Sequence, residues 1–86
     1  MDMNSTPRMA PGCRLHPTES VLLIPEGTLN LTGPTREILT KLDGQKNVTA
    51  VVTDLLQQYE GADVAEMQKD VLDLLNRLEQ RGVVRA

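Results

Sequence analysis

The sequence predicts an α+β domain, a small winged helix-turn-helix-like fold in which an N-terminal β-hairpin or three-stranded sheet precedes three α-helices. Three observations predict this class. A β-branched and leucine-rich segment enters a Pro-Glu-Gly turn at residues 25–27 and returns with alternating leucines. Residues 48–59 and 64–78 each carry apolar side chains at helical spacing, and a shorter apolar segment precedes them at residues 38–42.

Length and composition predict one small domain. The chain has 86 residues, and a domain of this size buries only roughly 60% of the surface that its unfolded chain exposes. Tyr59 is the only aromatic residue, so branched aliphatic side chains must fill the core. Residues 1–12 mix Met, Pro, Gly and Ser without periodicity, and we expect a disordered leader there, followed by a single domain at residues 13–86.

Residues 21–31 predict the hairpin. The first strand is Val21–Ile24, and the turn at residues 25–27 has the chemistry of a three-residue loop because Pro presets φ and Gly accepts a left-handed conformation. The return strand, Thr28–Leu31, alternates leucines with polar residues. Leu29 and Leu31 should therefore face the core, and the polar side chains should face water.

Three amphipathic helices follow. The first should begin near Thr32 and stop at Asp43-Gly44, the second should begin after Asn47, and the third should begin after Asp63. A final Val83-Val84 pair should pack back on the core or pair at a sheet edge. The residues expected to face the core are Ile38, Leu39 and Leu42 in the first helix, Val48, Val51, Val52, Leu55, Leu56 and Tyr59 in the second, and Val64, Met67, Val71, Leu74, Leu75 and Leu78 in the third.

Charge argues against binding to nucleic acids or membranes. The net charge is −3, and the acidic residues of the third helix outnumber its basic ones, whereas a DNA-recognition helix needs an excess of cations. The sequence has no apolar stretch of about 20 residues that would cross a membrane. Its one cysteine, Cys13, cannot form an internal disulfide, so we expect a cytoplasmic protein.

The sequence contains no pattern of catalytic, cofactor-binding or metal-binding residues. Cys13 and His16 have no partners at ligand spacing, and there is neither a Ser-His-Asp set nor a glycine-rich phosphate loop. Glu26, Asp43 and Asp70 are single carboxylates, which are better explained as solvated or capping groups. We therefore expect a protein that is not an enzyme and holds no cofactor and no metal.

A sheet this small favours partner binding instead. It should expose an edge whose unpaired N–H and C=O groups can receive an extended peptide. Two other arrangements are open at this point, because the segment around Arg14-Leu15 or a second copy of the chain in a homodimer would also cover such an edge.

Several short blocks, taken in their order, resemble the PqqD family of pyrroloquinoline quinone biosynthesis. They are Arg14-Leu15, Leu22-Leu23-Ile24-Pro25-Glu26-Gly27, Leu29-Asn30, Ile38-Leu39, Asp43-Gly44, Asp70-Val71 and Arg81-Gly82-Val83. The resemblance covers nearly everything after Gly12. The chain departs from the family at Ser20 or Ile24, where family members often carry Trp or Tyr.

The resemblance implies a peptide-recognition element that acts as a non-catalytic peptide chaperone. Such domains bind the ribosomal precursor peptide PqqA and present it to the radical S-adenosylmethionine enzyme PqqE, which cross-links a Glu and a Tyr of that peptide. The peptide adds as a strand to the return strand and lies against the third helix. The implied peptide-binding residues are Thr28, Leu29, Asn30, Leu31, Asp70, Val71, Leu74 and Arg77. Two alternatives are a recognition element of another ribosomal-peptide modification pathway and a winged-helix nucleic-acid-binding protein.

Overall fold

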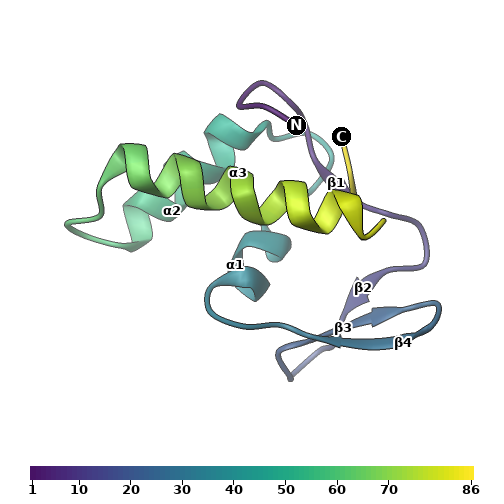
Figure 1. The fold of residues 1–86 in the computed structure, drawn as a ribbon. Coiled ribbons are helices and arrows are strands. Elements are labelled where there is room, and N and C mark those ends of the chain that lie inside the picture. Colours follow the sequence, from purple (N-terminus) through teal and green to yellow (C-terminus); the bar gives the residue numbers. More distant parts are fainter.

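Two small antiparallel sheets and three helices make up the fold, and the computed structural model describes all residues 1–86. The α+β class, with a three-stranded sheet before three helices, is confirmed; the second sheet was not expected (Figure 1). No helix combines the length and the apolar composition needed to cross a membrane. The elements are β1 (Arg8–Met9), β2 (Arg14–Leu15), β3 (Val21–Ile24), β4 (Gly27–Asn30), α1 (Thr35–Thr40), α2 (Val48–Gln58), α3 (Val64–Gln80) and β5 (Val84–Arg85).

β3 is the central strand of the larger sheet, which has the order β2-β3-β4. Leu22 pairs with Leu15 on one side and Leu29 on the other, so the three leucines share the face that packs on the core. The loop between β3 and β4 differs from the expected three residues, because Gly27 pairs with Ile24 and only residues 25–26 are left to turn. Gly27 has a φ of 142°, which residues with a side chain rarely adopt.

The predicted N-termini of α2 and α3 are confirmed by their capping hydrogen bonds. The Asn47 side chain accepts from the backbone N–H of Ala50 at 2.9 Å, and the Asp63 side chain accepts from that of Glu66 at 3.0 Å. Each cap satisfies a first-turn donor that has no partner within its own helix.

α1 is shorter than expected and begins later. Residues before Thr35 form a turn in which the Thr35 hydroxyl donates to the Thr32 carbonyl oxygen at 2.7 Å. Pro34 occupies the cap position and offers no side-chain acceptor, so Thr32 does not cap the helix as predicted. Ile38 and Leu39 are buried as expected.

The core lies where α2, α3 and the two sheets meet. Tyr59 and Val64 were expected in it, but 39% and 52% of their surface is exposed, because α2 ends before Tyr59 and α3 only begins at Val64. Leu42, Leu56, Met67 and Leu74 pack at its margin. The core residues are Leu22, Ile38, Leu39, Val48, Val51, Val52, Leu55, Val71, Leu75, Leu78, Val83 and Val84.

Residues 1–12 are packed against the domain, in contrast to the expected disordered leader. The carbonyl oxygens of Met3 and Ser5 accept from the N–H groups of Thr49 and Val48 at 3.1 and 3.0 Å. These donors belong to the first turn of α2 and need acceptors from outside the helix. The segment thus completes the cap of α2 through its backbone.

β1 and β5 form the second sheet and bring the chain ends together. Arg8 pairs with Arg85 and Met9 with Val84, and the Ala10 N–H donates to the Val83 carbonyl oxygen at 2.8 Å. The expectation that the last valines pair at a sheet edge is confirmed.

Candidate peptide-binding groove

β4 forms a free edge of the larger sheet, because β2 pairs with the opposite side of β3. The Arg14-Leu15 segment therefore does not cover β4. Among the two edges of this sheet, β4 is the longer strand, with four residues against two. It offers the row of backbone groups that an added strand requires.

The direction of each β4 amide group follows from one hydrogen bond. The Leu31 N–H donates to the Ser20 carbonyl oxygen at 2.8 Å, and donors alternate between the two sides of an antiparallel strand. Leu29 and Leu31 therefore direct their backbone groups toward β3, and Thr28 and Asn30 direct theirs away from the sheet. The Leu31 N–H is therefore not on the open edge of the sheet. The outward N–H and C=O groups belong to Thr28 and Asn30.

A groove runs between α3 and the chain that leaves β4. Its larger part has a volume of about 1070 Å³ and lies between α3, α1 and the end of α2. A smaller hollow of about 160 Å³ continues from it along β4. Leu74 and Arg77 line both parts, so the two hollows are adjacent sections of one groove.

Seven of the eight predicted binding residues line this groove. The larger part is lined by Asp70, Val71, Leu74 and Arg77, and the smaller part is lined by Leu29, Asn30 and Leu31 together with Leu74 and Arg77. Thr28 lines neither part, and its contribution is the outward backbone edge. The fold has brought two segments that are about 40 residues apart in the chain to opposite walls of one groove.

The α3 wall has an apolar floor with charged residues above it. Val71 is buried, and Leu74 is half-buried and packs beside the core, whereas Asp70 and Arg77 are exposed. Asp70, Leu74 and Arg77 follow at i, i+4 and i+7, which places them on one face of the helix.

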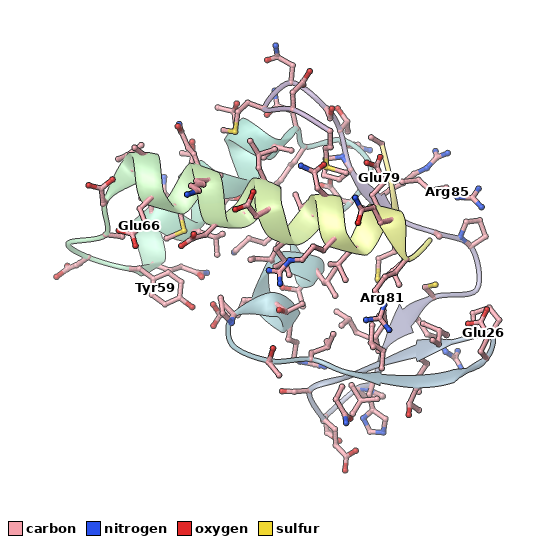
Figure 2. All side chains as sticks on the ribbon, in the orientation of Figure 1. Glu26, Tyr59, Glu66, Glu79, Arg81 and Arg85 are labelled. Carbon is pink, nitrogen blue, oxygen red and sulfur yellow. The ribbon has the colours of Figure 1, made fainter.

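The far end of the groove contains a pair that the sequence analysis missed. The Tyr59 hydroxyl donates to the Glu37 carboxylate, which joins the end of α2 to α1. This hydrogen bond raises the pKa of Tyr59 above its ordinary value. In the view of Figure 2, Tyr59 and Glu66 lie toward one end of α3 and Arg81 lies at the other end. The sequence signal that could have indicated this pair is the tendency of a tyrosine hydroxyl to bind a polar partner.

The wall formed by α1 is fixed to the β2–β3 connection. The Arg36 guanidinium donates to the carbonyl oxygens of Glu19 and Pro17 at 2.6 and 3.3 Å. His16 orders the same connection, because its Nδ1 accepts from the N–H groups of Thr18 and Glu19 at 3.2 and 3.1 Å.

Lys46, Asp54 and Asp43 lie outside the groove. Lys46 and Asp54 form an ion pair of 2.7 Å, which raises the pKa of Lys46 and lowers that of Asp54. Backbone hydrogen bonds from Gln45 and Lys46 lower the pKa of Asp43, which agrees with its expected role as a capping group. No three His, Cys, Asp or Glu side chains gather closely enough to hold a metal ion.

Comparisons with known proteins identify one family. The sequence model of the family "Coenzyme PQQ synthesis protein D (PqqD)" matches residues 19–84. A PqqA binding protein of Acinetobacter baumannii strain SDF is 34% identical over 84 residues, which cover 93% of this chain and 87% of the relative. A PqqA binding protein of Pseudomonas fluorescens is 36% identical over 74 residues, which cover 81% and 79%.

A solved structure matches the whole fold. It is the solution NMR structure of the PqqD truncation of Methylobacterium extorquens PqqCD, described as a functional, stand-alone recognition element for ribosomally synthesised and post-translationally modified peptides. Its TM-score is 0.83 at 31% identity, and the match covers 99% of this chain and 94% of that one. On these matches, the chain belongs to the PqqD family.

Proposed function

We propose that this protein binds the precursor peptide PqqA in the groove between β4 and α3, as a recognition element of pyrroloquinoline quinone biosynthesis. One observation carries the proposal: the outward backbone groups of Thr28 and Asn30 lie on the strand that borders the apolar floor at Leu74. The relatives named PqqA binding protein support PqqA as the peptide.

The affinity for PqqA should come from both walls of the groove, β4 and α3. A net hydrogen bond contributes about 1 kcal/mol, so the few bonds that β4 offers give only a modest free energy of binding. Burial of apolar peptide side chains against Leu31 and Leu74 must supply the rest, at about 25 cal/mol per Å². The peptide should therefore alternate apolar side chains toward the floor with polar ones toward water.

The site can be tested by following amide signals during titration with PqqA. Chemical-shift changes should concentrate on Thr28–Leu31 and on Asp70–Arg77, and Gln57→Ala on the outer side of α2 should leave the affinity unchanged. If the changes concentrate instead on Val48–Gln58, the groove is not the binding site.

The proposal extends to the partner enzyme. The protein acts without catalysis of its own, in the cytoplasm, by presenting the peptide to the radical S-adenosylmethionine enzyme PqqE. Binding both peptide and enzyme raises the effective concentration of a flexible substrate at the catalyst. The outer side of α2, with Gln57 and Gln58, is available as the second face because both side chains are exposed.

A reconstituted cross-linking assay tests this role. With PqqA well below saturation, adding the protein should raise the yield of cross-linked peptide, and Asn30→Pro should reduce that gain. Equal yields with and without the protein would contradict presentation while leaving peptide binding intact.

The free β4 edge could also pair with a second copy of the chain in a homodimer. Two β4 edges could pair in a second copy and would then compete with the peptide for the same backbone groups. Sedimentation should show a dimer that dissociates as PqqA is added if this pairing occurs, and a monomer throughout if it does not.

A further inference from the structure

Charged side chains are sorted by sign along the groove face of α3. Asp70, Leu74, Arg77 and Arg81 follow at i, i+4, i+7 and i+11, so they form one stripe along the helix. Asp70 and Asp73 line the part of the groove near α1, and Arg81 lines the part beside β4. In Figure 2, Arg81 points from the end of α3 toward the sheet, whereas Glu79 points to the other side.

The chain segment that forms the wall opposite α3 runs antiparallel to α3. Leu29–Leu31 lines the same section of the groove as Arg81, and the following Thr32–Ile38 segment lines the section that contains Asp70 and Asp73. Glu37 belongs to this second section and adds a third carboxylate to it. Two arginines also line this section: the Arg36 guanidinium donates to the carbonyl oxygens of Glu19 and Pro17, and Arg77 lies where the two sections meet. The groove therefore has an acidic end near α1 and a basic end beside β4.

These α3 charges have no ionic partner within the chain. The two ion pairs of the structure join the Met1 amino group to Glu79 and Lys46 to Asp54. Asp73 and Arg77 are spaced for an ion pair along the helix, yet the Arg77 Nε donates to the Asp73 backbone carbonyl at 3.4 Å. The helix dipole favours Arg77 in the last turn, but it does not favour acidic residues two turns inside the helix.

We propose that this charge order selects the peptide: a basic residue binds beside Asp70 and Asp73, and an acidic residue binds beside Arg77 and Arg81. The inference rests on the proposed function and specifies which peptides the groove accepts. Along the helix, the opposite charges are separated by about 6 Å between Asp73 and Arg77 and by about 16 Å between Asp70 and Arg81. An extended peptide covers these lengths in about two to five residues.

Strand pairing with β4 sets the direction of the peptide relative to this charge order. Antiparallel pairing is more stable per residue than parallel pairing, so a strand added to β4 runs from the Asn30 end toward the Gly27 end. Its N-terminal part then lies at the acidic end of the groove. The basic residue therefore precedes the acidic residue in the peptide sequence, and the reversed peptide would place like charges together.

Charge reversal in the protein tests the selection. In isothermal titration with PqqA at low salt, the Arg77→Glu, Arg81→Glu double variant should bind about tenfold more weakly, and higher salt should reduce the difference. The matched control is Lys69→Glu with Arg85→Glu, which changes the net charge equally at exposed positions outside the groove. Equal weakening in both double variants, or none in either, would overturn the proposal.

A complementary change in the peptide makes the test specific. A PqqA variant whose acidic residue in this segment is replaced by Lys should recover affinity for the Arg77→Glu, Arg81→Glu protein and lose it for the unmodified protein. Absence of this exchange would overturn the proposal, because the charges would then act only through the overall electrostatic field of the protein.

The direction is tested with PqqA carrying a nitroxide at either end of the bound segment. The N-terminal label should broaden the amide signals of Tyr59 and Glu66, and the C-terminal label those of Arg81 and Gly82. The reverse pattern would overturn the inference while leaving peptide binding in place. Failure of the unmodified protein to bind PqqA at all would instead overturn the proposed function.

Discussion

The α2–α3 pair and the three-stranded sheet differ in how completely the chain covers them. Val48, Val51, Leu55 and Leu75 are at most 1% exposed in the helix pair, whereas Leu22 is the only buried residue of the sheet. The two edge strands of that sheet, β2 and β4, also have no neighbour on their outer sides. The helix pair thus supplies seven of the twelve core residues, and the sheet keeps backbone groups and half-buried leucines available. The contrast indicates that stability and binding depend on different residues.

The largest expected effect lies in the helix pair. Leu75→Ala should lower the free energy of unfolding by about 3–5 kcal/mol, because it opens a cavity in a fully buried site. Leu74→Ala, one residue earlier at the groove floor, should cost about 1 kcal/mol of stability and weaken PqqA binding. Urea unfolding and titration calorimetry measure the two effects. Equal stability losses would remove the distinction between the two regions.

Two proline substitutions in and next to β4 distinguish its outward backbone groups from its inward ones. Asn30→Pro removes an outward N–H, so it should weaken PqqA binding at least tenfold and leave the circular dichroism spectrum unchanged. Leu31→Pro removes the donor to the Ser20 carbonyl and should cost about 1–3 kcal/mol of stability. The assignment of the edge is wrong if Asn30→Pro unfolds the protein as readily as Leu31→Pro does.

Removal of residues 1–6 tests whether the N-terminal segment belongs to the stable region. The deletion leaves the N–H groups of Thr49 and Val48 without their carbonyl acceptors and should cost about 1–2 kcal/mol. PqqA affinity should not change, because none of these residues lines the groove. An unchanged melting temperature would show that the segment contributes nothing to stability.

The smallest effect concerns Tyr59 at the end of the groove. Its raised pKa means that the hydroxyl stays protonated in the folded protein to a higher pH than in the unfolded chain. The hydrogen bond to Glu37 therefore contributes stability below the unfolded pKa of about 10, and this contribution disappears as the pH rises through the folded value. Ultraviolet absorbance should show tyrosinate forming at lower pH in Glu37→Gln. Identical titrations of both proteins would contradict the pairing.

Much of the fold follows from local patterns in the sequence. Asn47 and Asp63 mark the starts of α2 and α3 because their side chains cap the first turn, and the apolar spacing identifies most of the core. Tyr59 continues that spacing beyond the end of α2, so periodicity alone assigns it to the wrong environment.

Features that depend on pairing could not be predicted in the same way. The outward direction of the Asn30 amide depends on the hydrogen-bond alternation of β3 and β4, and a hydrophobic pattern identifies the side-chain face but not that alternation. The packing of residues 1–12 uses backbone carbonyls, which every residue carries and no side-chain pattern reveals. The order of acidic and basic residues along α3 can be read from the sequence. The chain segment that faces them across the groove cannot.

The pairing of Arg8 with Arg85 gives the molecule a mechanical weak point away from its groove. Tension between the two chain ends first loads the contacts of Met3 and Ser5 with the start of α2, and then the hydrogen bonds of the β1–β5 sheet one after another. The β3–β4 hairpin lies inside the chain and bears no such load until the core opens. In the view of Figure 1, α3 separates the chain ends from that hairpin. A protein attached at either end could therefore pull on this domain without distorting its peptide groove.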